Sequence, residues 1–199
     1  MEYKFTQLFI PLILLLIILL YVKNQKSEVI SVRSTVDHVA YIVQNKKDKQ
    51  QAADLLAQLR IKLIEFVNGL KSGKVKDDDR VKRLVDKFQA DKISEGNEDT
   101  NYTTYTLNKG EKIVFCLRTR DKNDNLHDLN MILFVAIHEM GHICTLSTGH
   151  TEEFQKNFKF LLEQAVEMKI YQPVNYRENP TTYCGIAVTD TPLEDKHFK

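Results

Sequence analysis

The pattern of apolar and polar positions separates an uncharged N-terminal run from a body with mixed helical and strand periodicity. Residues 5–22 (FTQLFIPLILLLIILLYV) carry no charged side chain, and as a helix they would rise about 27 Å, just enough to cross the hydrocarbon core of a bilayer. No small-residue cleavage site follows, so we predict a retained single-pass anchor and not a cleaved signal peptide. Lys4 precedes the run, whereas Lys23, Lys26 and Arg33 follow it, which predicts a membrane protein with a cytosolic body.

The first half of the body is expected to be mostly helical. Residues 23–35 are polar and indicate a tether, and the β-rich residues 36–43 (VDHVAYIV) predict a short strand. Apolar residues recur at helical spacing over 48–68, which predicts a helix whose stripe packs in the core. A second, shorter helix is predicted over 77–88, where three aspartates favour its N-terminus, and residues 90–100 indicate an irregular connection.

The second half of the body has strands followed by a strongly apolar helix. Two β-rich runs, 102–107 and 111–118, are separated by a three-residue loop that ends in glycine, which is typical of a bulged hairpin. The apolar residues 130–137 (NMILFVAI) predict a helix that continues into HEMGH at 138–142. We therefore expect an α+β protein, with an N-terminal transmembrane helix and a β-hairpin or sheet before the HEMGH helix.

The length of 199 residues, with 43% apolar content, is enough for one domain with appendages. We predict an anchor with its flank at residues 1–26 and a tether with a mostly helical part at 27–100. The core of the domain is predicted at 101–192, followed by a short tail at 193–199.

Charge and cysteine content exclude several classes of protein. The 28 basic and 27 acidic side chains nearly cancel, and the basic stretch at residues 71–76 is short and followed by aspartates, so no nucleic-acid partner is indicated. The three cysteines, Cys116, Cys144 and Cys184, are too few and too scattered for a disulfide framework. We expect all three to be reduced, with Cys144 as a small core residue.

The HEMGH segment has the spacing of a metal site. His138 and His142 are four residues apart, so a helix places both imidazoles on one face. Glu139 follows the first of them, where its carboxylate can reach a metal-activated water as general base. Burying these polar side chains without partners on so apolar a helix would cost free energy. A bound metal would remove most of that cost. We predict a Zn²⁺ ion bound by His138 and His142.

A catalytic zinc site needs a third protein ligand. His150 directly follows Gly149, where a turn can return the chain towards the metal, and we prefer it. Glu163 and Glu167, on the next predicted helix, are the alternatives.

Two further polar residues near this segment are assigned structural roles. His127 lies near the start of the HEMGH helix, and we interpret it as capping or surface polarity and not as a ligand. Tyr183, in TTYCG, is either a donor to a developing oxyanion or an aromatic packed beneath the site, and packing is preferred.

Residues 102–192 resemble a known family of enzymes. HEMGH followed by His150 in GHTEEF is similar to the SprT-like and WLM-like zinc metallopeptidases, and it resembles most an uncharacterised branch of this group in large nucleocytoplasmic DNA viruses. The other matching stretches are YTLNKGEKIVFCLR, IYQPVNY and YCGIAVTDTPL. The resemblance implies a small zincin-like domain, His138, His142 and His150 as zinc ligands, and Glu139 as general base or acid. The nucleic-acid-binding segments of the cellular relatives have no counterpart here, so a DNA-repair role is not expected.

Together these patterns predict a membrane-anchored zinc-dependent metallopeptidase acting on a protein or peptide substrate. Its body would face the cytosol, or the inside of a virion or of a viral internal membrane. The alternative is a non-catalytic, membrane-tethered structural protein, such as a virion component, that retains the zincin fold. The intact Glu139 favours the enzyme.

Overall fold

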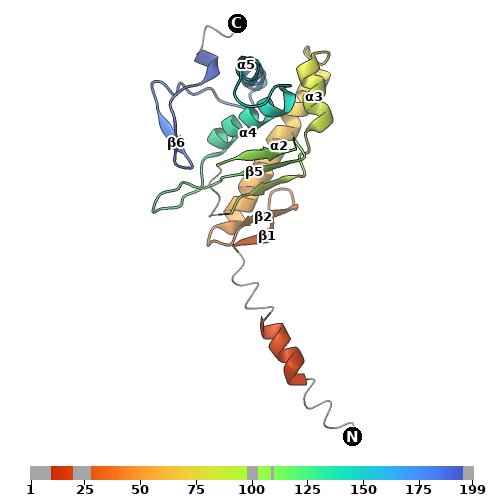
Figure 1. Ribbon diagram of the computed structural model, residues 1–199, viewed down its shortest axis with the longest axis vertical. Coiled ribbons are helices and arrows are strands. Elements are labelled where there is room, and N and C mark those ends of the chain that lie inside the picture. The colour runs from red at the N-terminus through yellow and green to blue at the C-terminus, as the bar shows by residue number, and fades with distance from the viewer. Residues whose placement is uncertain (1–9, 20–27, 98–102, 109, 195–199) are drawn as a thin grey trace.

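The computed structural model describes residues 10–19, 28–97, 103–108 and 110–194, and its body is α+β, with helices packed on short strands (Figure 1). In chain order the elements of the body are β1 (Val29–Arg33), β2 (Ala40–Gln44), α2 (Lys49–Ser72), α3 (Asp79–Lys87), β3 (Ile93–Glu95), β4 (Tyr105–Leu107), β5 (Lys112–Phe115), α4 (Leu129–Cys144), α5 (Glu152–Glu167), β6 (Thr181–Tyr183), β7 (Ile186–Val188) and the 3-10 turn η1 (Pro192–Glu194).

The predicted membrane anchor is the main correction. A helix covers residues 10–19, while the rest of the predicted span, 5–9 and 20–22, lies outside the described residues. Within the described ranges, no helix has both the length and the apolar content needed to span a bilayer. The predictions of a transmembrane helix and of a single-pass protein with a cytosolic body are therefore wrong on this finding.

The strands form three small sheets. β1 pairs with β2, the order β3-β5-β4 makes the second sheet, and β6 pairs with β7. The β4–β5 hairpin is confirmed, and it leaves β4 as an edge strand. Three local predictions differ from the structure. The residues predicted as a tether include β1, and the strand predicted over 36–43 begins only at Ala40. The segment 90–100, predicted to be irregular, contains β3. β3 has three residues that are all buried, so it shows no alternation to detect.

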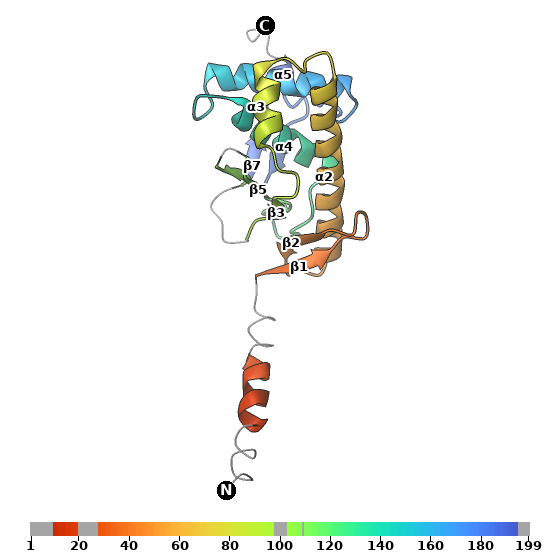
Figure 2. The same cartoon turned by 90° about the vertical axis from the view of Figure 1, so that its right-hand side faces the viewer.

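The helices build the core around α4. α2 and α3 agree with the two predicted helices, and α4 packs against α5, α3 and α2. α2 continues through Gly69, where a Cβ atom would lie 1.9 Å from Cε of Met168, and it ends before Gly73. Gly69 therefore allows close packing and does not end the helix. α5 lies at the end of the body opposite β1 and β2 (Figure 2).

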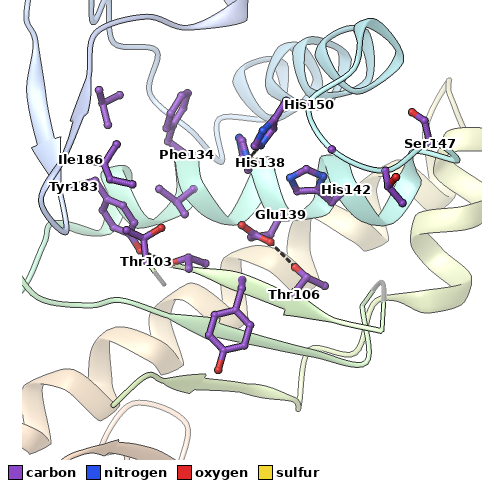
Figure 3. A pocket seen from close by; sticks show the side chains of 16 residues that line it. Thr103, Thr106, Phe134, His138, Glu139, His142, Ser147, His150, Tyr183 and Ile186 are labelled. Atoms are coloured by element: carbon purple, nitrogen blue, oxygen red, sulfur yellow. Dashed lines mark hydrogen bonds between the residues drawn. The ribbon is translucent and has the colours of Figure 1, made fainter. Parts of the chain in front are cut away.

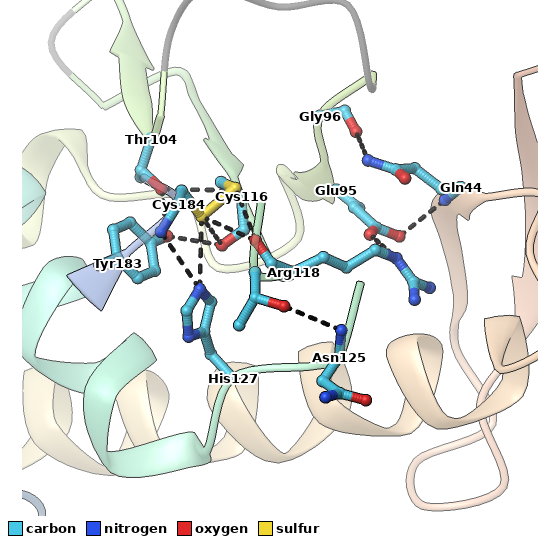
Figure 4. Close-up of a disulfide and its surroundings, with 11 residues drawn as sticks. Gln44, Glu95, Gly96, Thr104, Cys116, Arg118, Asn125, His127, Tyr183 and Cys184 are labelled. Carbon is cyan, nitrogen blue, oxygen red and sulfur yellow. Dashed lines mark hydrogen bonds and ion pairs between the residues drawn. A yellow bond between two sulfur atoms is a disulfide. The ribbon is translucent and has the colours of Figure 1, made fainter. Parts of the chain in front are cut away.

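A disulfide joins the end of β5 to the β6–β7 hairpin (Figure 4). Cys116 and Cys184 are 68 residues apart in sequence, yet their Cα atoms lie 6.4 Å apart. The prediction that all three cysteines are reduced is wrong for this pair, because packing of the hairpin against β5 could not be read from their sequence separation. Cys144 is free and buried, as predicted.

Candidate functional site

Helix α4 places His138 and His142 of the HEMGH segment on one face, one helical turn apart. The side chain of Asp128 accepts a hydrogen bond from the Met131 backbone N–H at 2.9 Å and so fixes the start of the helix. Apolar residues bury most of the helix, which leaves His138 and His142 half-buried with ring centroids 5.0 Å apart. The predicted helix and the shared face of the two imidazoles are confirmed.

His150 reaches the same place from the loop that follows α4. The loop turns at Gly149, whose φ of 81° lies in the left-handed region that favours glycine. Nε2 of His150 lies 2.9 Å from Nε2 of His138, and its ring centroid is 4.9 Å from that of His142. One ligand atom from each of the three histidines lies within 4.8 Å of the others (Figure 3).

Glu153, in the first turn of α5, holds this loop in place. Its carboxylate accepts hydrogen bonds from the backbone N–H groups of Leu146 and Ser147, at 3.0 and 3.1 Å. These hydrogen bonds lower the pKa of Glu153 to about 2. Sequence reasoning assigned no role to Glu153, although it belongs to the GHTEEF segment.

Phe154 packs against all three imidazoles. Its ring stacks on His142 with centroids 4.2 Å apart, and it contacts His138 and His150 at 4.8 and 4.9 Å. A Cβ atom at Gly141 would lie 3.0 Å from the Phe154 ring, so the glycine of HEMGH allows α5 to approach this closely.

Burial, followed by repulsion from the other two imidazoles, lowers the pKa of His138 to about 3, which keeps it neutral.

Glu139 points away from the histidine rings and towards the edge strand β4. It is buried, with 6% of its surface exposed, and its Oε2 accepts a hydrogen bond from Oγ1 of Thr106 on β4 at 2.6 Å (Figure 3). Burial raises the pKa of the Glu139 carboxyl, and the hydrogen bond from Thr106 acts in the opposite direction. Sequence reasoning missed Thr106, because the contact depends on how β4 crosses α4.

These side chains open into one cleft of about 580 Å³. Its walls come from β4, α4, the loop after α4 and the β6–β7 hairpin, and its lining residues include Glu139 and the three histidines. The size is in the range of sites that accommodate a small ligand or a few peptide residues.

The alternative ligands lie elsewhere. Glu163 and Glu167 are exposed on α5, and Glu167 is 3.8 Å from the ammonium group of Lys74. In the described part of the chain, neither carboxylate belongs to the group of side chains close enough to share a metal ion. The geometry therefore places His150, and not these two residues, beside His138 and His142.

Tyr183 and His127 contribute to the support of the cleft. The hydroxyl of Tyr183 donates to the carbonyl oxygen of Cys116 at 2.7 Å and lies 2.5 Å from Oγ1 of Thr104, so its hydrogen bonds serve packing. The His127 ring lies against Tyr183, with centroids 4.9 Å apart, and its Nε2 accepts the Cys184 backbone N–H at 3.3 Å. The prediction of capping or surface polarity for His127 is therefore wrong, since this ring is half-buried beside the disulfide.

Comparison with known proteins places the chain among proteins of large DNA viruses. It is 32% identical over 182 residues to the uncharacterised protein R325 of Acanthamoeba polyphaga mimivirus, and the match covers 86% of this chain and 88% of the relative. The chain belongs to the family of R325. This family is uncharacterised, so it assigns neither a metal nor a reaction to the three histidines.

Two further matches to viral proteins are shorter. The chain is 36% identical over 69 residues to uncharacterised protein 136R of Invertebrate iridescent virus 6, which covers 34% of the chain and 38% of the relative. It is 38% identical over 71 residues to uncharacterised protein 042R of Invertebrate iridescent virus 3, which covers 35% and 43%. No family model matches the chain, and no solved structure matches it. The relationship to large DNA viruses is thus established at the level of the R325 family.

Proposed function

We propose that this member of the R325 family is a zinc-dependent metallopeptidase. The observation that supports the proposal best is the convergence of His138, His142 and His150, with ligand atoms within 4.8 Å of one another, in a cleft that also contains the buried Glu139. The resemblance of HEMGH and GHTEEF to SprT-like and WLM-like enzymes supports the same assignment.

The three imidazoles suit zinc. A tetrahedral zinc ion with bonds of about 2.0–2.1 Å separates its nitrogen ligands by roughly 3.3 Å, a value between the 2.9 Å approach of His138 to His150 and the 4.8 Å upper limit of the group. Zinc binds the neutral imidazole, and His138 is held neutral. Three protein ligands also leave a fourth position for a reacting molecule, as catalytic zinc sites require.

The chain supplies a general base beside these ligands. When bound, zinc would activate a water molecule and polarise the scissile carbonyl. Glu139 lies next to His138 and lines the same cleft, so its carboxylate takes the proton of the attacking water and later returns it to the leaving amine. Thr106 fixes the orientation of this carboxylate through its hydrogen bond to Oε2.

The edge strand β4 supplies a place for an extended substrate. β5 pairs with β4, and the order β3-β5-β4 makes β4 an edge strand of the described sheet. Residues 103–106 of this segment line the cleft beside Glu139. A peptide that added to β4 as a further strand would therefore run along the cleft that contains Glu139 and the three histidines. The substrate class we propose is an unstructured protein segment.

The direct test is metal content together with metal-dependent cleavage. The purified full chain is expected to contain one zinc per molecule, measured by elemental analysis, and to cleave an unstructured protein such as casein. A chelator should abolish the cleavage, and added zinc should restore it. A zinc-loaded chain that cleaves nothing in a broad peptide library would instead favour a non-catalytic structural protein.

The role of Glu153 gives a second prediction. Glu153→Gln weakens the hydrogen bonds to the two loop amides, so the loop that carries His150 is held less firmly. Zinc affinity is expected to fall on the order of 10-fold, as for other residues that orient a ligand. Glu152→Gln is the matched control, since Glu152 is exposed and pairs with Lys156. Equal zinc affinity of the two variants in a competition titration would show that Glu153 does not position His150.

A further inference from the structure

The β6–β7 hairpin forms one wall of the cleft, near the N-terminal half of α4 (Figure 3). Its register pairs Tyr183 with Ile186 and Thr182 with Ala187. Paired residues of an antiparallel ribbon share a face, and successive residues alternate between faces. Tyr183, Ile186 and Val188 therefore share one face, and all three line the cleft, whereas Thr182 and Ala187 lie on the opposite face.

The apolar surface of the hairpin continues onto α4. Phe134 and Val135 lie about one helical turn before His138 and line the same cleft. The side chain of Ile186 is 56% exposed, so apolar surface is open to solvent at this end of the cleft. On the far side of the histidines the lining residues are Ser147, Thr148 and Gly149, which are small. The cleft thus has an apolar end and a small polar end.

Fixed charge is nearly absent from the cleft. Among the described residues that line it, Glu139 is the one with an Asp, Glu, Lys or Arg side chain. A charged substrate side chain at the apolar end would lose hydration, and none of the lining residues Phe134, Ile186 and Val188 offers it an opposite charge. An aliphatic or aromatic side chain would instead remove its own surface and that of Ile186 from water, which is favourable.

The hairpin wall is held in position before any ligand binds. The disulfide fixes Cys184 to Cys116, and the Tyr183 hydroxyl donates to the carbonyl oxygen of Cys116. A wall that does not have to be ordered during binding discriminates between side chains at a lower entropic cost.

We propose that the apolar end of the cleft selects a large aliphatic or aromatic side chain next to the scissile bond. The inference rests on the proposed peptidase function and adds the substrate class: unstructured segments with a large apolar residue next to the cleaved bond. Ile186 and Val188 are the specificity-determining residues, together with Phe134 and Val135 opposite them.

Binding of peptide hydroxamates tests this inference without turnover. A hydroxamate binds zinc directly and presents the neighbouring side chain to the cleft. The zinc-loaded full chain is expected to bind a leucine hydroxamate at least 10-fold more tightly than the matching aspartate hydroxamate, measured by calorimetry. The metal content of each sample is measured in parallel.

The variant Ile186→Lys should lower this preference at least 10-fold, because it places a cation in the apolar end. Thr182→Lys is the matched control, since it adds the same charge to the opposite face of the hairpin and should leave the preference unchanged. Both positions are exposed, so neither substitution disturbs the core.

The outcomes separate the two proposals. Equal affinity of the zinc-loaded chain for the two hydroxamates would overturn the apolar selection and leave the peptidase proposal intact. An unchanged preference in Ile186→Lys, with zinc still bound, would do the same. A wild-type chain without bound zinc would overturn the proposed function and this inference with it, and the metal analysis identifies that case.

Discussion

The Glu139→Gln variant is expected to fold, to retain zinc and to lose cleavage by a factor of ~10² to 10⁴, the usual effect of removing a general base. Glutamine keeps the shape of the side chain and can still accept the hydrogen bond from Thr106. It cannot take a proton from the attacking water. The expected loss is therefore in kcat, measured with an unstructured substrate, while zinc content and thermal unfolding stay close to those of the wild type.

Glu152→Gln is the control for this experiment, because it makes the same chemical change at an exposed position outside the cleft. It should cleave as the wild type does. If zinc-loaded wild type and Glu139→Gln are equally inactive on a broad peptide library, the enzyme proposal fails and a structural role becomes the better account of the fold.

The second large effect is expected for His150→Ala. This change removes one of three proposed ligands. Loss of a residue that only hydrogen-bonds to a metal ligand lowers metal affinity ~10- to 100-fold, so zinc affinity should fall by more than this when the ligand itself is lost. Glu163→Ala and Glu167→Ala should leave zinc affinity unchanged, because both carboxylates are exposed on α5 and outside the histidine cluster. Competition with a chromogenic chelator measures all three variants on one scale.

The contrary result is equally clear. If His150→Ala binds zinc as the wild type does and one of the glutamate variants loses it, then the third ligand comes from α5 and the loop after α4 has another role. Unfolding curves of the metal-free variants provide the control for loss of structure.

The sequence predicts the part of the site that depends on local geometry. An apolar run fixes α4, and spacing of four residues on a helix is enough to place His138 beside His142. The glycine before His150 predicts a turn that brings this histidine back towards the metal. The φ of Gly149, in the left-handed region, supports that reasoning. Local rules thus account for the three histidines.

Other features depend on packing between distant segments. The contact of Thr106 with Glu139 requires the crossing of β4 over α4, and no pattern within either segment predicts it. β3, β6 and β7 have three residues each, too few to show a period. The anchor prediction is wrong for a different reason: it relied on composition, and no helix within the described residues combines the length and the apolar content needed to span a bilayer.

The disulfide between Cys116 and Cys184 closes a covalent ring that contains α4, α5 and all three histidines. A single cut of the backbone anywhere inside this ring leaves both pieces attached to each other. A molecule nicked there, by itself or by a second copy, would migrate as the intact chain on a non-reducing gel and separate into two bands only after reduction. Comparing the two gels therefore locates a cut inside or outside the ring before any fragment is sequenced.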